Sequence, residues 1–133
     1  MRLCVEMAKQ FIRTPNAPQP IGPYSQGVKA GNFLFVAGQG PSDPKTGQIA
    51  AEEIETQTRQ TLTNIKGIVE ASGLSMRDVV KVSIFLKSLD DFKKMNEAYK
   101  TFFPENPPAR TTVEARLPIP GMLIEIDVVA YRE

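Results

Sequence analysis

With 133 residues, 41% of them hydrophobic, the chain has the length and composition of one globular domain. Its sixteen Lys and Arg side chains are matched by fifteen Asp and Glu, so the net charge of +1 gives no general attraction to nucleic-acid phosphates or anionic lipid. The sequence has no histidine and a single cysteine, which excludes Ser-His-Asp and Cys-His sites and an intrachain disulfide, and no metal site is expected.

The N-terminal region lacks the features of a targeting or membrane segment. No stretch approaches the roughly 20 apolar residues that span a bilayer, and Glu6 interrupts the first apolar run before it reaches signal-peptide length. We interpret residues 1–133 as a single domain, with residues 1–7 as a candidate N-terminal extension and Met7 as an alternative start. Cys4 lies in this extension and is not expected to be catalytic. A single thiol is typical of a reducing compartment, and we predict a cytoplasmic protein.

The distribution of proline indicates where the regular elements lie. All eleven prolines precede residue 45 or follow residue 103, so the longest helices and strands are expected between these positions. Residues 8–13 are predicted to form a short strand, and residues 28–37 two strands joined by a turn at 30–32. The apolar run 33–37 predicts a central strand that is buried on both faces.

Two helices and a strand are predicted in the middle of the chain. Residues 52–72 have helical periodicity and end before Gly73, a residue typical of helix termini. Residues 79–86 alternate as a strand, and residues 90–103 form the second helix, which Pro104 ends. The predicted core positions of these three elements are, in order, Ile54, Thr58, Leu62, Ile65 and Val69; Val80, Val82, Ile84 and Leu86; and Phe92, Met95, Tyr99 and Phe102.

The last part of the chain is predicted to add two strands. Even-numbered residues of 110–116 point to one face and odd-numbered residues to the other, and residues 122–131 form the final strand. Helices and strands that do not alternate strictly predict an α+β fold, with two helices covering one face of a mixed sheet. The other face is predicted to carry Phe85, Thr112, Leu123 and Val129. A sheet face this bare generally needs a partner, so we expect a homo-oligomer.

Two charged residues of these strands are candidates for chemistry. Arg110 opens a strand after Pro107-Pro108-Ala109, where a guanidinium can hold a carboxylate by two parallel hydrogen bonds. The same pattern fits a surface Arg in a solvated ion pair. Glu125 interrupts an apolar strand, and partial burial would raise its pKa toward the range that suits proton transfer to or from water. An interface ion pair with Arg110 or Arg116 fits this position as well.

Three other motifs carry weaker signals. Tyr24 follows a Gly-Pro turn and can either offer its hydroxyl to a ligand or pack as an aromatic side chain. Asn96 fits both a helix-surface residue and a ligand contact. Residues 38–40 begin like a dinucleotide-binding fingerprint, but Asp43 stands where a glycine is required, so this motif is dismissed.

Several short motifs together resemble the RidA (YjgF) family. They are Gly22-Pro23-Tyr24-Ser25-Gln26, Phe35-Val36-Ala37-Gly38-Gln39, Asp43-Pro44-Lys45-Thr46-Gly47, Asn64-Ile65-Lys66, Pro108-Ala109-Arg110-Thr111-Thr112-Val113-Glu114 and Ile124-Glu125-Ile126-Asp127. Each is weak alone, but they occur in register from about residue 9 to residue 132 without a large insertion.

This resemblance implies both a fold and an activity. The fold would be similar to chorismate mutase of the AroH type, assembled as a homotrimer with three sites in the clefts between subunits. The activity would be a deaminase that hydrolyses reactive imines and enamines, namely 2-iminobutanoate, 2-iminopropanoate and tautomers of 2-aminoacrylate, to 2-oxo acids and ammonia. These intermediates leak from pyridoxal-phosphate enzymes, and the family removes such metabolite damage with no cofactor and no metal of its own.

The resemblance also implies roles for individual residues. Arg110 would bind the substrate carboxylate, and Glu125 would orient and activate the attacking water. Tyr24 would line the pocket, and Gly38 would offer backbone contacts. The backbone carbonyl of Thr112 would help to hold the imine nitrogen or the water.

Asn96 matches a family position near the site with less certainty than the others. The chain also departs from some family members at two positions. Some members have Ser where this chain has Ala37, and Cys where it has Thr112, which bears on rate, preference and pocket size. Two other functions stay open: a non-catalytic metabolite-binding or regulatory trimer that uses Arg110 as an anchor, and an endoribonuclease, against which the near-neutral charge and the absence of histidine weigh.

Overall fold

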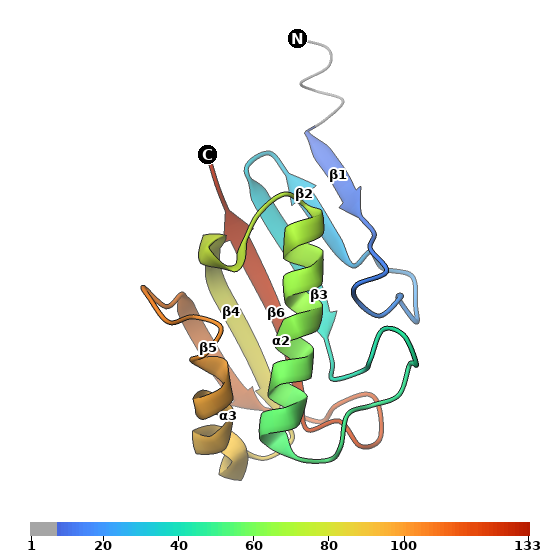
Figure 1. The fold of residues 1–133 in the computed structure, drawn as a ribbon, viewed down its shortest axis with the longest axis vertical. Coiled ribbons are helices and arrows are strands. Elements are labelled where there is room, and N and C mark those ends of the chain that lie inside the picture. Colours follow the sequence, from blue (N-terminus) through green and yellow to red (C-terminus); the bar gives the residue numbers. More distant parts are fainter. Residues whose placement is uncertain (1–7) are drawn as a thin grey trace.

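The computed structural model describes residues 8–133, so the predictions about Cys4 and the extension at residues 1–7 lie outside the described residues. One sheet of six strands runs through this part of the chain in the order β1-β2-β3-β6-β4-β5 (Figure 1). All neighbouring strands are antiparallel except β4 and β5, which are parallel. The strands are β1 (Lys9–Ile12), β2 (Gly27–Ala30), β3 (Phe33–Gln39), β4 (Val79–Leu86), β5 (Ala109–Glu114) and β6 (Ile124–Tyr131).

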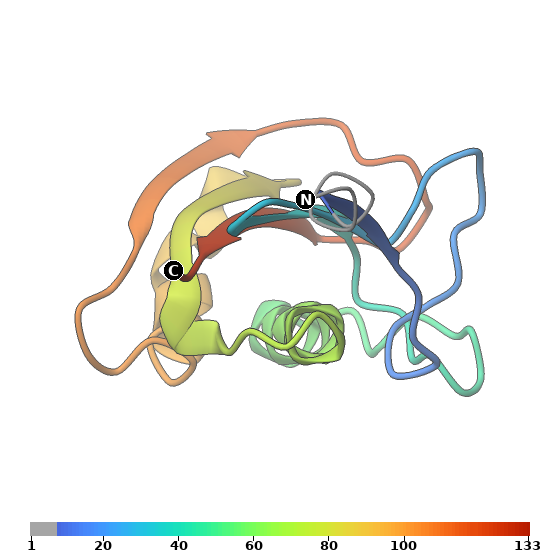
Figure 2. The same cartoon turned by 90° about the horizontal axis from the view of Figure 1, so that it is seen from above.

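The two α-helices of residues 8–133, α2 (Ile54–Ala71) and α3 (Phe92–Tyr99), pack on the same face of the sheet, which confirms the α+β prediction. The sheet curves around α2, which lies on the concave side (Figure 2). Short 3-10 turns, η1 (Met76–Asp78) and η2 (Leu89–Asp91), precede β4 and α3. Glu53 caps α2, because its carboxylate accepts hydrogen bonds from the backbone N–H groups of Glu55 and Thr56.

The hydrophobic core lies between α2, α3 and the sheet. The predicted face of α2 is confirmed, because Ile54, Thr58, Leu62, Ile65 and Val69 are all buried. In β4 the prediction fails at one position. The pairing of β4 with β6 shifts register between Val79 and Lys81, so Val79 is buried and Val80 is turned outward.

The face of the sheet opposite the helices has no cover within residues 8–133. The expectation that the run 33–37 is buried on both faces is wrong within a single copy of the chain, because Phe33 and Phe35 are 43% and 48% exposed. Phe11 and Val113 are exposed on the same face, which we call the open face. Thr112, predicted to lie there, lies on the helix side instead, because the parallel pairing places it beside the buried Ile84.

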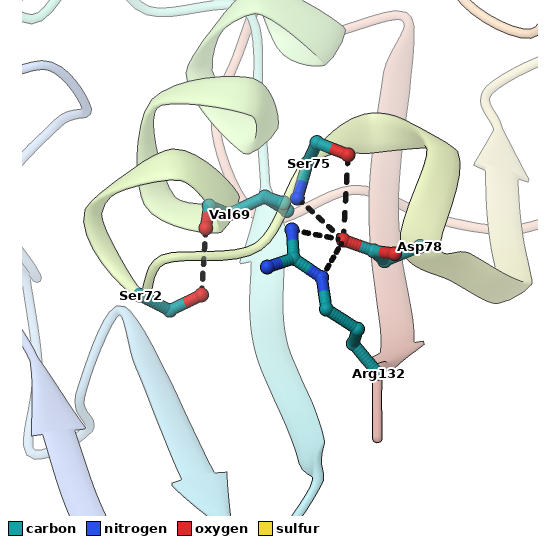
Figure 3. A network of polar contacts seen from close by, with 5 residues as sticks. All are labelled: Val69, Ser72, Ser75, Asp78 and Arg132. Atoms are coloured by element: carbon teal, nitrogen blue, oxygen red, sulfur yellow. Dashed lines mark hydrogen bonds and ion pairs between the residues drawn. The ribbon is translucent and has the colours of Figure 1, made fainter.

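The end of β6 is tied to the segment that follows α2 (Figure 3). The Arg132 guanidinium donates to Asp78 from Nη2 at 2.8 Å and from Nε at 3.1 Å, and the Ser75 N–H donates to the same carboxylate at 2.8 Å. Burial opposes the charge of Asp78, but these hydrogen bonds outweigh it and hold the pKa of Asp78 below its ordinary value. Ser72 closes α2 beside this network, where its hydroxyl donates to Val69 O at 2.6 Å.

Candidate functional site

Arg110 is the second residue of β5, an edge strand of the sheet, and its side chain lies between this strand and α3. The pairing of β5 with β4 places it beside Val82, so its side chain is on the helix side. Its guanidinium carbon lies 4.7 Å from the centre of the Tyr99 ring and 5.6 Å from that of Phe92. Within the described chain the ion pairs join Lys100 to Glu97 and Arg132 to Asp78, so this half-buried guanidinium has no carboxylate partner there.

Uncharged polar groups lie on the same faces of β5 and α3 as the contacts of Arg110. Thr112 follows Arg110 on the helix side of β5, and Asn96 lies between Phe92 and Tyr99 on one face of α3. Asn96 Oδ1, the Tyr99 hydroxyl and Thr112 Oγ1 are buried, and none has a hydrogen-bond partner of standard geometry among residues 8–133. Burial raises the pKa of Tyr99, and Arg110 only partly offsets this effect through its positive charge and a hydrogen-bond contact, so the hydroxyl stays neutral. The candidate residues Arg110, Asn96 and Thr112 therefore lie together in one region, which we call the arginine region.

Glu125 lies on the other side of the sheet. It is paired with Phe85 in the β4–β6 ladder and is half-buried on the open face. Burial, and then the charge of Asp127 two residues along the same face, raise the pKa of Glu125 above its ordinary value. A raised pKa brings this carboxyl closer to the pH range in which it can both accept and release a proton.

A bulge in β3 brings Gly38 against Glu125. The pairing of β3 with β6 is regular up to Val36 and shifts before Gln39, so Ala37 and Gly38 together face a single position of β6. A Cβ atom placed on Gly38 would lie 3.0 Å from Glu125 Cδ and closer still to Oε2. The absence of a side chain at residue 38 is therefore what lets the carboxylate occupy its place.

One cavity of about 100 Å³ is lined by Glu125, Gly38 and Tyr24. Pro118, Ile119 and Met122 form part of its apolar wall. We call this cavity and its carboxylate the glutamate region. Tyr24 is 47% exposed, and its hydroxyl accepts a hydrogen bond from the Ile21 N–H at 3.3 Å.

Two buried amides of α2 hold the loops that form this cavity, and sequence reasoning missed the role of both. Gln57 donates to Gly121 O at 2.9 Å and accepts from the Leu123 N–H at 2.8 Å, which fixes one loop. Asn64 donates to Gly40 O at 3.0 Å and to Ser42 O at 2.8 Å, which fixes the other. The signal in the sequence is that both amides fall on the apolar face of the helix, where polar side chains are buried only with partners.

The structure does not bring all the predicted site residues together in one chain. Arg110 and Glu125 lie on opposite faces of the sheet, so an ion pair between them within a chain is excluded, and Arg116 forms none in the described part. Three larger hollows, of about 550, 510 and 250 Å³, contain neither Arg110 nor Glu125, and Tyr24 lines the last of them as well. None of the helices in residues 8–133 has the length and hydrophobicity that a membrane span requires, and no three Asp, Glu, Cys or His side chains in this range are grouped as metal ligands.

The sequence and the fold match one group of known proteins over nearly their whole length. A family model described as Endoribonuclease L-PSP matches residues 14–132. A RutC family protein of Pyrococcus horikoshii is 59% identical, covering 94% of this chain and 99% of the relative. The 2-iminobutanoate/2-iminopropanoate deaminase of Salmonella typhimurium is 50% identical, covering 91% of this chain and 96% of that enzyme.

A solved structure agrees with these sequence matches. Escherichia coli TdcF with bound serine superposes with a TM-score of 0.89 at 42% identity, covering 93% of this chain and 99% of that one. Fold, length and sequence thus lead to the same group of proteins, and the chain belongs to the RidA (YjgF) family.

Proposed function

We propose that this protein is a cofactor-independent deaminase that hydrolyses small 2-imino and enamino acids, such as 2-iminobutanoate and 2-iminopropanoate, to 2-oxo acids and ammonia. The observation that carries the proposal is Arg110, a half-buried guanidinium with aromatic and uncharged polar neighbours and no carboxylate partner in the described chain. A buried cation is ordinarily paired, so a site of this kind is suited to a carboxylate that arrives with the ligand.

The reaction also requires a base that removes a proton from the attacking water, and we assign this role to Glu125. An imine carbon is already electrophilic, so the protein needs only to position a water molecule and move protons. Glu125 takes a proton from the water as the water oxygen bonds to the imine carbon, and returns that proton to the nitrogen, which gives a carbon bearing one hydroxyl and one amino group. Glu125 then transfers the hydroxyl proton to the amino group, the carbon–nitrogen bond breaks, and ammonia leaves as the carbonyl forms. A carboxyl with a raised pKa is suited to both transfers.

The two regions can act on one small substrate only if they come from two copies of the chain. The sheet separates them within one copy, and β5, which carries Arg110, is an edge strand of the sheet. The open face exposes Phe11, Phe33, Phe35 and Val113, an apolar surface of the kind that subunits bury. We therefore propose a homotrimer of the chorismate-mutase-like type, with the arginine region of one copy beside the glutamate region of the next.

The relatives support the same substrate class. One relative is named as a 2-iminobutanoate/2-iminopropanoate deaminase, and one structural neighbour holds serine, a small amino acid with the carboxylate that Arg110 would recognise here. The source of substrate would be a pyridoxal-phosphate enzyme that releases imines, and we propose the cytoplasm as the shared compartment.

The proposal is tested by trapping free imine. A pyridoxal-phosphate dehydratase acts on serine or threonine in the presence of semicarbazide, and semicarbazone formation is followed. Wild type is expected to suppress trapping, Arg110→Ala is expected to lose most of this effect, and Arg59→Ala, a substitution at an exposed residue of α2, is the matched control. Trapping that wild type leaves unchanged for several amino acids would contradict the proposal.

Two alternative functions can be tested with the same protein samples. The description of the matching family model favours endoribonuclease as a second candidate, and cleavage of single-stranded RNA by wild type would support it. The balance of sixteen basic against fifteen acidic residues argues against it. Binding of 2-oxobutanoate without any turnover would instead support a non-catalytic metabolite-binding protein.

A further inference from the structure

The guanidinium of Arg110 lies against two aromatic rings of the same helix. Phe92 is the first residue of α3 and Tyr99 the last, so the two rings lie about two turns apart along the helix. Tyr99 is the nearer, at 4.7 Å from the guanidinium carbon, compared with 5.6 Å for Phe92. Both distances are within the range of cation–π attraction.

The two rings are not equally placed. Tyr99 is only 6% exposed, and its other contacts include Phe103, whose ring centre lies 4.8 Å away. Phe92 is 39% exposed and so lies nearer the surface. Tyr99 is therefore held rigidly by the core, whereas Phe92 covers the guanidinium from the solvent side.

An aromatic partner has a consequence that a carboxylate partner would not have. A carboxylate fixes an Arg side chain by occupying its N–H donors and cancelling its charge. A ring attracts the cation through its face and leaves the donors at the guanidinium edge available for a planar anion. The Tyr99 hydroxyl is close to the guanidinium, but no side chain among residues 8–133 accepts a hydrogen bond of standard geometry from Arg110, so its donors are available in this structure.

We propose that Tyr99 and Phe92 are positioning residues that clamp Arg110 in its ligand-binding orientation while keeping it charged and its donors free. That the bound anion is the carboxylate of an imino acid rests on the proposed function. The clamp itself does not, because it concerns the order of the Arg110 side chain before any ligand binds.

The ring of Tyr99, rather than its hydroxyl, is the part that we expect to hold the guanidinium. Burial raises the pKa of the hydroxyl, and Arg110 lowers it through its charge and a hydrogen-bond contact, but that contact lacks the geometry of a standard hydrogen bond. Removing the hydroxyl and keeping the ring should therefore preserve the clamp. Replacing the ring by an aliphatic side chain of similar size should abolish it.

Three variants and a control test the clamp in the full-length protein. Tyr99→Phe keeps the ring, and Tyr99→Leu and Phe92→Leu each remove one ring. The control, Phe102→Leu, removes a partly buried ring that packs against the core, whereas the rings that lie over Arg110 are those of Phe92 and Tyr99. The first readout is the ¹H–¹⁵N NOE of the Arg110 Nε–H group, which reports the order of the side chain without any ligand. The second is the Kd for 2-oxobutanoate, the proposed product.

We expect an ordered Arg110 Nε–H group in wild type, Tyr99→Phe and Phe102→Leu. We expect a mobile Arg110 Nε–H group in Tyr99→Leu. The Kd should rise about tenfold in Tyr99→Leu and less in Phe92→Leu, in line with the strength of a partly desolvated cation–π contact. An ordered Arg110 in Tyr99→Leu, or equal disorder in Phe102→Leu, would overturn the clamp. Failure of wild type to deaminate imines, with Arg110 still ordered by Tyr99, would reject the proposed function and leave the clamp standing.

Discussion

The contact of Gly38 with Glu125 allows the proposed catalytic carboxylate to be displaced without being removed. In Gly38→Ala, the new methyl group would lie 3.0 Å from Glu125 Cδ and closer to Oε2. Carbon atoms in ordinary contact are about 3.5–4.0 Å apart, so the carboxylate must move by roughly 0.5–1 Å. A displacement of about 1 Å of a positioned group can cost about a hundredfold in rate, and we expect kcat to fall by this order.

The loss of rate should come with little loss of stability. Gly38 is exposed and does not have a positive φ, so alanine fits the backbone and the free energy of unfolding should change by less than about 1 kcal/mol. The imine-trapping assay and thermal unfolding measure the two effects. Gly22→Ala is the control, because its new methyl group meets only Tyr24, at 3.4 Å. Wild-type activity in Gly38→Ala, or an equal loss in both variants, would refute the reasoning.

Three further predictions follow from the hydrogen bonds and charges of the structure. Gln57→Leu should lower the free energy of unfolding by about 1–3 kcal/mol in denaturant titrations, because two partly buried backbone groups lose their partner. Arg132→Ala should cost about 0.5–1 kcal/mol at pH 7. The pKa of Asp78 is lowered in the folded state, so in unfolding experiments this cost should decrease as the pH falls below about 4, the ordinary pKa of Asp, and disappear once the pH is below the lowered pKa of folded Asp78. Asp127→Asn removes a negative charge that raises the pKa of Glu125, so the acid limb of the pH–activity profile should move to lower pH; an unmoved limb would exclude this coupling.

Most of the elements could be predicted from the sequence because their signals are local. The helical period of the residues on α2 and the alternation along β4 follow from one segment alone, and both were confirmed apart from the bulge at Val80. A bulge changes the face of one residue without changing the composition of the strand, so alternation cannot reveal it.

The placement of the site residues depended on pairing between distant segments. Thr112 was assigned to the wrong face because the parallel partner of β5 could not be identified from its own residues. The same pairing decides that Arg110 and Glu125 lie on opposite faces. The exposure of Phe33 and Phe35 has a related cause, because an apolar strand predicts burial but not whether the covering surface belongs to the same chain.

The central claim is that two copies of the chain build one site, and mixing two inactive variants tests it most directly. Arg110→Ala keeps the glutamate region intact, and Glu125→Gln keeps the arginine region intact. When the two are unfolded and refolded together in equal amounts, about one site in four of a cyclic oligomer should combine an unaltered Arg110 with an unaltered Glu125 from the neighbouring copy. We predict that the mixture recovers about a quarter of wild-type imine deamination, although each variant refolded alone is inactive. Mixed oligomers with no recovered activity would contradict a shared site.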